Sequence, residues 1–303
     1  MAAFEDRSWQ SRDGLSLHFR DYPGPEPEGA DSRRTPAICI PGLTRNARDF
    51  ETLAPHLAQA RRVICVDLRG RGDSDYAKDP HSYNQAQYAD DLADLLAAEG
   101  IDRFVAIGTS LGGLVTMLLA ARDPARIAGA VINDVGPELD PVGLERIGEY
   151  VGQGRSHETW MHAARALAEA NGAVYPDWAL ADWLRFAKRV MTLGSGGRVV
   201  FDYDMNIAVP FEALAEAAAT ARERGEPAQA APDLWPAWRA LGGRPLLLLH
   251  GALSDLLPAP VAARMVAEAP GCTLVTLLRV GHAPTLDEPE SVAAIDATLA
   301  RVD

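Results

Sequence analysis

Ser110 lies in a stretch whose residue types suit a nucleophile. The stretch Gly108-Thr109-Ser110-Leu111-Gly112 is a G-x-S-x-G pattern that follows an apolar run, residues 104–107, and precedes the apolar face of a helix. This context predicts a sharp strand-to-helix turn that presents the serine hydroxyl at the mouth of a sheet. Glycines are needed there because side chains at Gly108 and Gly112 would collide with the neighbouring chain. The alternative is an ordinary turn in which Ser110 only caps the helix.

A serine hydroxyl needs a base to remove its proton, and seven histidines compete for that role. His282 is the best placed, because it lies between the last predicted strand and the last predicted helix. His250 ends another predicted strand, where a packed, hydrogen-bonded histidine is the alternative. The remaining histidines lie in a predicted hairpin, in helices or in an insertion: His18, His56, His81, His157 and His162. The sequence therefore predicts His282 as the base.

Two aspartates compete to orient the imidazole. Asp255 follows the penultimate predicted strand and Asp134 follows an earlier one, so both can occupy the same edge of a sheet. The chain order serine, acid, histidine favours Asp255. If Asp134 is not the acid, it would anchor or cap the start of the insertion. If Asp255 is not the acid, it would be the N-cap of the next helix.

Backbone amides near Ser110 are expected to stabilise a developing oxyanion. The turn supplies the amide of Leu111, which follows the nucleophile. The second donor is predicted to be the amide of Leu43, since Gly42 lets the backbone approach closely. Arg45 is a candidate for binding a substrate carboxylate, and an ion pair with Asp49 is the alternative that we slightly favour.

These residues all follow predicted strands that are apolar throughout. Strands without internal alternation, joined by helices, indicate a mostly parallel sheet covered on both faces, preceded here by a hairpin around Asp13-Gly14. The ligand site of such a sheet lies beyond the carboxyl ends of its strands. We therefore expect one shared site. The predicted parallel strands are residues 37–41, 62–67, 104–107, 130–134, 245–250 and 272–278.

The strand–helix alternation stops between residues 137 and 232. That segment is alanine-rich, helical in pattern and dotted with aromatic residues, which predicts a helical lid inserted between core segments 1–136 and 233–303. Trp160 and Trp183 are hypothesised to line an apolar acyl pocket. The alternative is that they only pack the lid helices on one another.

Composition limits the classes of partner. The chain of 303 residues is 48% hydrophobic and 23% charged, as expected of a globular protein, and its net charge of −13 argues against nucleic acid or an anionic membrane. Residues 1–10 lack the apolar core of a signal peptide, and three cysteines in apolar runs favour free buried thiols. We expect a cytoplasmic protein with a small-molecule, ester-like substrate. No His/Asp/Cys cluster has metal-ligand spacing, so no metal or cofactor is predicted. The sequence leaves open whether the protein forms a homodimer.

Taken together, these segments resemble the α/β-hydrolase family, in particular its lid-bearing, esterase-like members. The resemblance implies an eight-stranded sheet whose second strand is antiparallel, with Ser110, Asp255 and His282 as a catalytic triad. One departure is Pro41-Gly42, where the family usually has His-Gly; it removes a histidine that commonly braces the oxyanion loop. The matching segments are residues 40–46, 67–74, 108–113, 133–137, 251–255 and 281–284.

The resemblance implies a carboxylesterase-like serine hydrolase that works through an acyl-enzyme. Serine at the turn, rather than aspartate, disfavours haloalkane dehalogenase and epoxide hydrolase chemistry. A lactonase, a thioesterase and a carbon–carbon hydrolase of ring-cleavage products are the alternatives within the fold. The last would need cations for a substrate carboxylate, for which Arg45, Arg185 and Arg189 are the candidates. A small-molecule receptor that retains the triad is the alternative from another class.

Overall fold

The chain opens with the hairpin that Asp13-Gly14 predicts. In the computed structural model, which describes residues 3–26, 34–224 and 232–303, β1 (Glu5–Gln10) pairs antiparallel with β2 (Ser16–Tyr22). Gly14 lies between them at φ +87°, a conformation that costs glycine little. The exposed loop predicted for residues 23–34 falls largely on residues 27–33, which lie outside the described residues.

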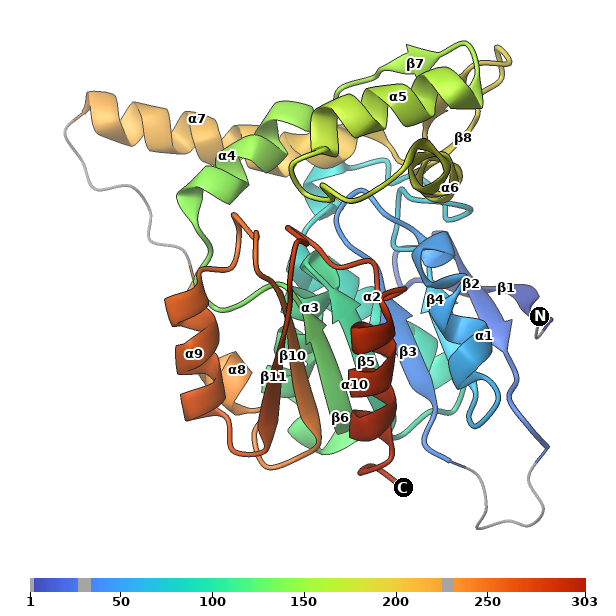
Figure 1. The fold of residues 1–303 in the computed structure, drawn as a ribbon, viewed down its shortest axis with the longest axis vertical. Helices are drawn as coiled ribbons and strands as arrows, with labels where there is room; N and C mark the ends of the chain where they lie inside the picture. The colour runs from blue at the N-terminus through green and yellow to red at the C-terminus, as the bar shows by residue number, and fades with distance from the viewer. Residues whose placement is uncertain (1–2, 27–33, 225–231) are drawn as a thin grey trace.

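Eight strands form one sheet in the order β1-β2-β4-β3-β5-β6-β10-β11 (Figure 1). β2 pairs antiparallel with both of its neighbours, and each further pair in the sheet is parallel. The predicted fold class, including the antiparallel second strand, is therefore confirmed. The remaining strands are β3 (Ala37–Ile40), β4 (Val63–Val66), β5 (Phe104–Thr109), β6 (Ile127–Asn133), β10 (Leu246–Gly251) and β11 (Cys272–Leu277).

Helices cover both faces of the sheet, which explains the strands' uninterrupted apolar runs. In β3, Ile38 and Ile40 pack with one cluster of buried residues, while Ala37 and Cys39 pack with the other. One face is covered by α2 (Gln85–Ala98), α3 (Leu111–Arg122), α8 (Trp235–Arg239) and α9 (Ala259–Glu268). The opposite face is covered by α1 (Leu53–Leu57) and α10 (Pro289–Leu299), and 3-10 turns lie at Ala47–Phe50, Pro80–Ser82 and Pro124–Arg126.

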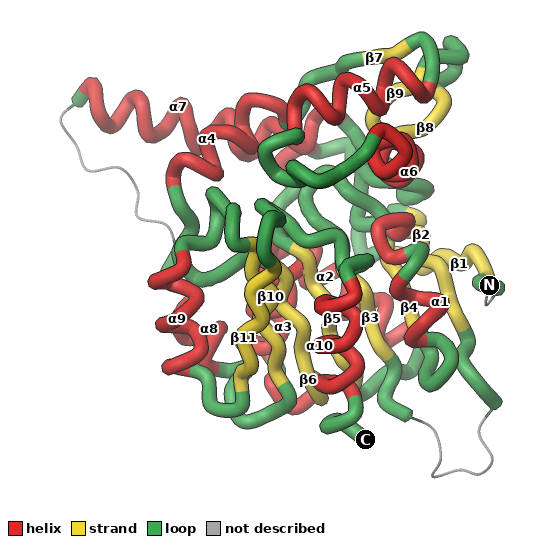
Figure 2. The backbone as a smooth tube through the Cα atoms, in the orientation of Figure 1, coloured by secondary structure: helices red, strands yellow, loops and turns green. Residues whose placement is uncertain are grey.

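An insertion between β6 and α8 lies above the carboxyl ends of the central strands (Figures 1 and 2). Its helices are the predicted lid helices, but it also contains a three-stranded sheet, β7-β9-β8, that the sequence does not predict. Strands of two or three residues are too short to show a periodicity. The insertion comprises α4 (Pro141–Tyr150), β7 (Ser156–His157), α5 (Trp160–Asn171), α6 (Leu180–Val190), β8 (Met191–Leu193), β9 (Val199–Phe201), a 3-10 turn (Met205–Ala208) and α7 (Val209–Glu223). The predicted boundary at residue 232 follows residues 225–231, which are outside the described part.

Buried polar contacts fasten the lid to the core. Arg189 of α6 is 3% exposed and pairs with Glu51 at 2.9 Å and Asp287 at 2.7 Å. The Tyr83 hydroxyl donates to Asp204 of the lid at 2.6 Å. Arg189 is buried, so losing its acidic partners would leave an uncompensated charge, which favours the observed position of the lid. No helix among the described residues is long and apolar enough to cross a bilayer.

Candidate active site

The turn between β5 and α3 holds Ser110 in a strained conformation. Its φ of 51° and ψ of −113° lie outside the common regions for a residue with a side chain. A Cβ on Gly108 would collide with the carbonyl of Gly112, and one on Gly112 would collide with the carbonyl of Ile40. The two glycines therefore have the steric role that the G-x-S-x-G pattern predicts.

The loop after β11 brings His282 to the serine. Ser110 Oγ lies 2.9 Å from His282 Nε2, although 172 positions separate the two residues in the chain. The His282 side chain is only 8% exposed. A hydroxyl at hydrogen-bond distance from a shielded imidazole can pass its proton to the ring as it attacks a carbonyl.

Asp134, at the end of β6, orients the imidazole. Its Oδ2 lies 2.8 Å from His282 Nδ1, and its Oδ1 accepts from the Gly251 amide at 2.8 Å. The carboxylate is completely buried, and the backbone of Asp134 has a φ of 55°. With both oxygens engaged, the carboxylate keeps a proton on Nδ1 and leaves Nε2 free to face Ser110.

The structure corrects the assignment of Asp255. That residue faces α4, where both carboxylate oxygens receive hydrogen bonds from Arg146, one of them at 2.8 Å to Nη2. Hydrogen bonds from the Arg146 guanidinium lower the pKa of Asp255 below its ordinary value, against partial burial that raises it. The chain order that favours Asp255 carries no information about Arg146, which comes from the lid. Asp134, the second candidate from the sequence, takes the place beside His282.

The loop carrying His282 is held by both the core and the lid. The side-chain amide of Asn133 donates to the carbonyl of Pro284 at 2.8 Å. From the lid, the Tyr175 hydroxyl donates to the carbonyl of Ala283 at 2.6 Å, and the Val174 carbonyl accepts from the amide of Gly281 at 2.7 Å. The residues on both sides of the imidazole are thus hydrogen-bonded in place.

Of the two predicted oxyanion donors, Leu111 is next to Ser110 in the chain, and Leu43 follows Gly42, where a Cβ would lie 3.7 Å from Ser110 Cβ. Leu111 opens α3 directly after the nucleophile, and neither its amide nor that of Leu43 donates a hydrogen bond to another described residue. The Leu43 carbonyl accepts from Nε of Arg71 at 2.6 Å. Arg71 is completely buried and also donates to the Tyr88 hydroxyl at 3.1 Å. A buried guanidinium therefore fixes the loop at a position where the family's usual histidine is missing, a support that the sequence motif alone did not indicate.

His250, the competing histidine, lies apart from this arrangement. Its Nε2 lies 3.0 Å from the carbonyl of Leu257, and the residue is buried at the end of β10. This is the packed, hydrogen-bonded role that was its alternative.

Arg45 forms the ion pair with Asp49 that was its alternative role, and its role in binding a substrate carboxylate stays a prediction. Its Nε donates to both oxygens of Asp49 at 2.9 Å, and its guanidinium stacks 4.4 Å from the ring centre of Phe186. It also lines a cavity of about 260 Å³ between the lid and the core. Arg185 and Arg189, the other two candidate cations, line a different cavity of about 190 Å³, where Arg185 pairs with Asp182.

The lid tryptophans pack within the lid. Trp183 is 3% exposed and lies in a cluster with Trp178, Tyr175 and Phe186, in which the rings of Trp178 and Trp183 are 4.7 Å apart. Trp160 packs against the same cluster. Neither Trp160 nor Trp183 lines either of the two cavities described above, so their packing favours the alternative, and the pocket role stays a prediction. Large amphipathic rings fill a small helical lid as readily as a binding pocket.

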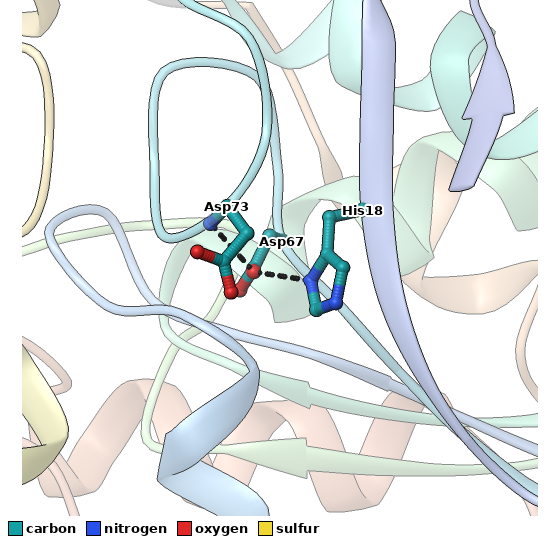
Figure 3. A group of neighbouring side chains, drawn as sticks. All are labelled: His18, Asp67 and Asp73. Atoms are coloured by element: carbon teal, nitrogen blue, oxygen red, sulfur yellow. Dashed lines mark hydrogen bonds and ion pairs between the residues drawn. The ribbon is translucent and has the colours of Figure 1, made fainter. Parts of the chain in front are cut away.

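One further cluster of ionisable groups joins His18, Asp67 and Asp73 (Figure 3). His18 Nδ1 lies 2.7 Å from Asp67, and Nε2 lies 3.0 Å from Asp6. Asp67 also accepts from the amides of Ala47 and Asp73. Burial alone would lower the pKa of His18, but the hydrogen bonds to Asp67 and Asp6 outweigh it and raise that pKa. Both ring nitrogens are engaged by carboxylates, so the cluster fastens the hairpin to the loop after β4. Sequence spacing did not indicate it, because β2 and that loop meet only in the folded sheet.

Comparisons with known proteins agree with the fold described above. Residues 37–295 match the model of the Alpha/beta hydrolase family. A 3-hydroxybutyrate-oligomer hydrolase from Cupriavidus necator is 34% identical over 262 residues, which cover 84% of this chain and 85% of the relative. A 2-(acetamidomethylene)succinate hydrolase from Mesorhizobium japonicum is 26% identical over 249 residues, 82% of each chain.

A solved structure also covers almost the whole chain. The crystal structure of an alpha/beta hydrolase from Novosphingobium aromaticivorans is 62% identical and superposes with a TM-score of 0.88. The match covers 99% of both chains, so it includes the lid as well as the sheet.

Proposed function

Because the chain belongs to the alpha/beta hydrolase family, we propose that it is a serine hydrolase that cleaves carboxylic esters of small molecules through an acyl-enzyme. The observation that carries this proposal is the unbroken series of contacts from Ser110 Oγ to His282 Nε2 at 2.9 Å and from His282 Nδ1 to Asp134 at 2.8 Å. A nucleophile, a base and an orienting carboxylate in series are what acyl transfer requires.

In the proposed reaction, Ser110 Oγ attacks the ester carbonyl while His282 Nε2 accepts the hydroxyl proton. The amides of Leu111 and Leu43 donate to the oxyanion of the tetrahedral intermediate, and the imidazolium then protonates the departing alkoxide. A water molecule, deprotonated by His282, attacks the acyl-enzyme and releases the acid. Oxyanion donors of this kind are worth about 10² to 10³ in rate.

We assign the orienting carboxylate to Asp134. As the imidazole becomes positively charged, a buried carboxylate 2.8 Å from Nδ1 stabilises that charge without having to reorganise. Asp255 is engaged by Arg146 and would first have to break that ion pair.

One relative favours an open-chain oxygen ester over a thioester, a lactone or a carbon–carbon bond. The Cupriavidus necator relative, 34% identical along most of both chains, is named for hydrolysing 3-hydroxybutyrate oligomers, whose monomers are joined by esters. The nucleophile, base and acid described above suit such a bond without further groups. Short esters of hydroxy acids are therefore the first substrates to test.

The test is the intact mass of the protein after exposure to a fluorophosphonate, which modifies only an activated serine. Wild type is expected to gain one adduct, whereas Ser110→Ala and His282→Ala are expected to gain none while keeping the wild-type circular dichroism spectrum. A panel of short esters, thioesters and lactones, including a hydroxybutyrate dimer, then ranks substrate classes by kcat/KM. Folded Ser110→Ala that keeps esterase activity would contradict the proposal. A folded wild type that neither reacts nor turns over any member of the panel would favour the receptor alternative.

A further inference from the structure

The cavity of about 260 Å³ between lid and core has a charge opposite to that of the whole chain. Three arginines and one glutamate lie in its lining, whereas the chain carries a net charge of −13. Cations gathered in a cavity with apolar walls concentrate an anionic ligand and strengthen its binding. The charged lining residues are Arg45, Arg146, Arg155 and Glu149, and the apolar ones include Leu167, Phe186, Val190 and Met191.

Arg45 is placed to use the free part of its guanidinium. Its hydrogen bonds to Asp49 are made through Nε alone, and within the described chain its two terminal nitrogens donate to no acidic side chain. Phe186 packs against the guanidinium plane at 4.4 Å, which holds that plane in one orientation. A guanidinium fixed in this way is organised in advance for a carboxylate.

Arg146 enters the same cavity from α4. It donates to Asp255 through Nε and Nη2, which leaves Nη1 without an acidic partner among the described residues. Asp255 is 31% exposed at its side chain, so the ion pair is open to solvent on one side. Tyr150, one turn further along α4, also lines the cavity, and its neutral hydroxyl can donate a hydrogen bond there.

Gly42 lies between the cavity residue Arg45 and the nucleophile. A Cβ on Gly42 would lie 3.4 Å from Arg45 Cγ and 3.7 Å from Ser110 Cβ, so Arg45 and the nucleophile flank this glycine. Neither Ser110 nor His282 is in the cavity lining, which places the cavity next to the reaction centre rather than at it. A ligand anchored at Arg45 would therefore need to span only the width of this loop to place a scissile bond near Ser110.

We propose that Arg45 and Arg146 bind a free carboxylate of the substrate, so that the enzyme prefers short esters that carry a negative charge a few atoms from the scissile bond. The inference rests on the proposed serine hydrolase function and adds that the lid selects substrates with a free carboxylate. Tyr150 supplies a further donor to the carboxylate, and the apolar walls contact the short carbon chain between it and the ester. Asp255 holds Arg146 in position, which gives this aspartate a role away from His282.

Matched ester pairs that differ in one charge test the proposal. On the acyl side, the pair is the mono-para-nitrophenyl ester of glutaric acid and the same compound with its free carboxylate methylated. On the alcohol side, the pair is β-acetoxybutyrate and its methyl ester, followed by acetate release. The ratio of kcat/KM, charged over neutral, is measured for wild type, Arg45→Gln, Arg146→Gln and Arg165→Gln. Arg165 is exposed on α5 and outside the cavity lining, so it serves as the matched control.

Wild type is expected to prefer the charged member of at least one pair. Each of Arg45→Gln and Arg146→Gln should lower that ratio by about tenfold to a hundredfold, the value of a hydrogen bond to a charged group, chiefly through KM. Arg165→Gln should keep the wild-type ratio, and Arg146→Lys should recover part of the loss because it restores the charge without the planar fork.

Equal ratios in wild type and both arginine variants, for both pairs, would overturn the carboxylate site while leaving the hydrolase function intact. Failure of the hydrolase function itself gives a different result, since neither member of any pair would then be cleaved by wild type.

Discussion

The carboxyl ends of β6 and β10 are neighbouring regions, and each is followed by an aspartate whose carboxylate has a different role. The two strands are parallel and adjacent, with Leu249 of β10 opposite Asn133 of β6. Asp134 follows the last residue of β6 directly, whereas Asp255 lies four positions after Gly251, the last residue of β10. Both carboxylates thus lie at the edge of the sheet where Ser110 is presented.

Distance from the strand separates their roles. Asp134 is completely buried, and the strand end that precedes it leaves its carboxylate little freedom. Asp255 lies in a loop that extends toward the lid, and Arg146 of α4 binds it there. A carboxylate that is buried and rigid suits an imidazole that must change its charge, whereas a partly exposed one suits an arginine that must meet a ligand.

The largest expected effect is that of Asp134→Asn. Asparagine keeps the shape of the side chain but cannot stabilise the imidazolium, so kcat on a good ester should fall by about a thousandfold to ten-thousandfold. Steady-state kinetics with a circular dichroism check on folding measures this loss. Activity close to wild type would show that Asp134 does not orient His282. Full recovery of kcat at alkaline pH would show instead that the substitution acts only by shifting the protonation of His282.

Asn133→Ala should have an intermediate effect on the same strand end. It removes the hydrogen bonds to Pro284 at 2.8 Å and to the Thr109 hydroxyl at 3.1 Å, both of them buried. We expect a loss of about 1 to 3 kcal/mol in the free energy of unfolding and about a tenfold drop in kcat, because the loop carrying His282 is loosened. Urea unfolding and kinetics check the two values. A destabilised protein with wild-type kcat would mean that the loop needs no such support.

Asp255→Asn should have a smaller effect on catalysis. We expect kcat on a neutral ester to fall by less than about tenfold, since the strong orienting contact stays with Asp134. The comparison with Asp134→Asn, made on the same ester, decides between the two strand ends. A loss as large as that of Asp134→Asn would support Asp255, the aspartate that chain order predicts, as the residue that orients His282. The double variant would then show whether either aspartate can orient His282 when the other is absent.

The smallest effect concerns stability against pH. Hydrogen bonds from Arg146 lower the pKa of Asp255, so the folded state favours its charged form. The ion pair therefore contributes stability above the unfolded pKa of about 3.9, and this contribution is lost as pH falls through the lower, folded value. At pH 7 the free energy of unfolding of wild type should exceed that of Asp255→Asn by less than about 1 kcal/mol, because the ion pair is partly exposed. The unfolding free energies of wild type and Asp255→Asn should converge as the pH is lowered from 7 to 3. A difference between the two that grows on acidification would contradict the lowered pKa of Asp255.

Much of the fold and half of the candidate site follow from local sequence. The apolar runs predict the parallel strands, Asp13-Gly14 predicts the hairpin, and Gly108 and Gly112 predict the turn at Ser110. The short lid strands, the pairing of Arg146 with Asp255 and the packing of Trp183 do not follow from it. Each of these depends on which segment of the lid comes to rest against the core, and no local pattern encodes that position.

The sequence by itself determined that a serine is presented at a strained turn, that a histidine follows the last strand, and that the sheet is mostly parallel. Backbone geometry of that kind is set within a few residues by glycines and by the period of apolar side chains. The tertiary structure decided which aspartate reaches His282 and where the arginines gather. A hydrogen bond to an imidazole requires a placement precise to a fraction of an ångström, and a competing cation on a distant segment changes the outcome.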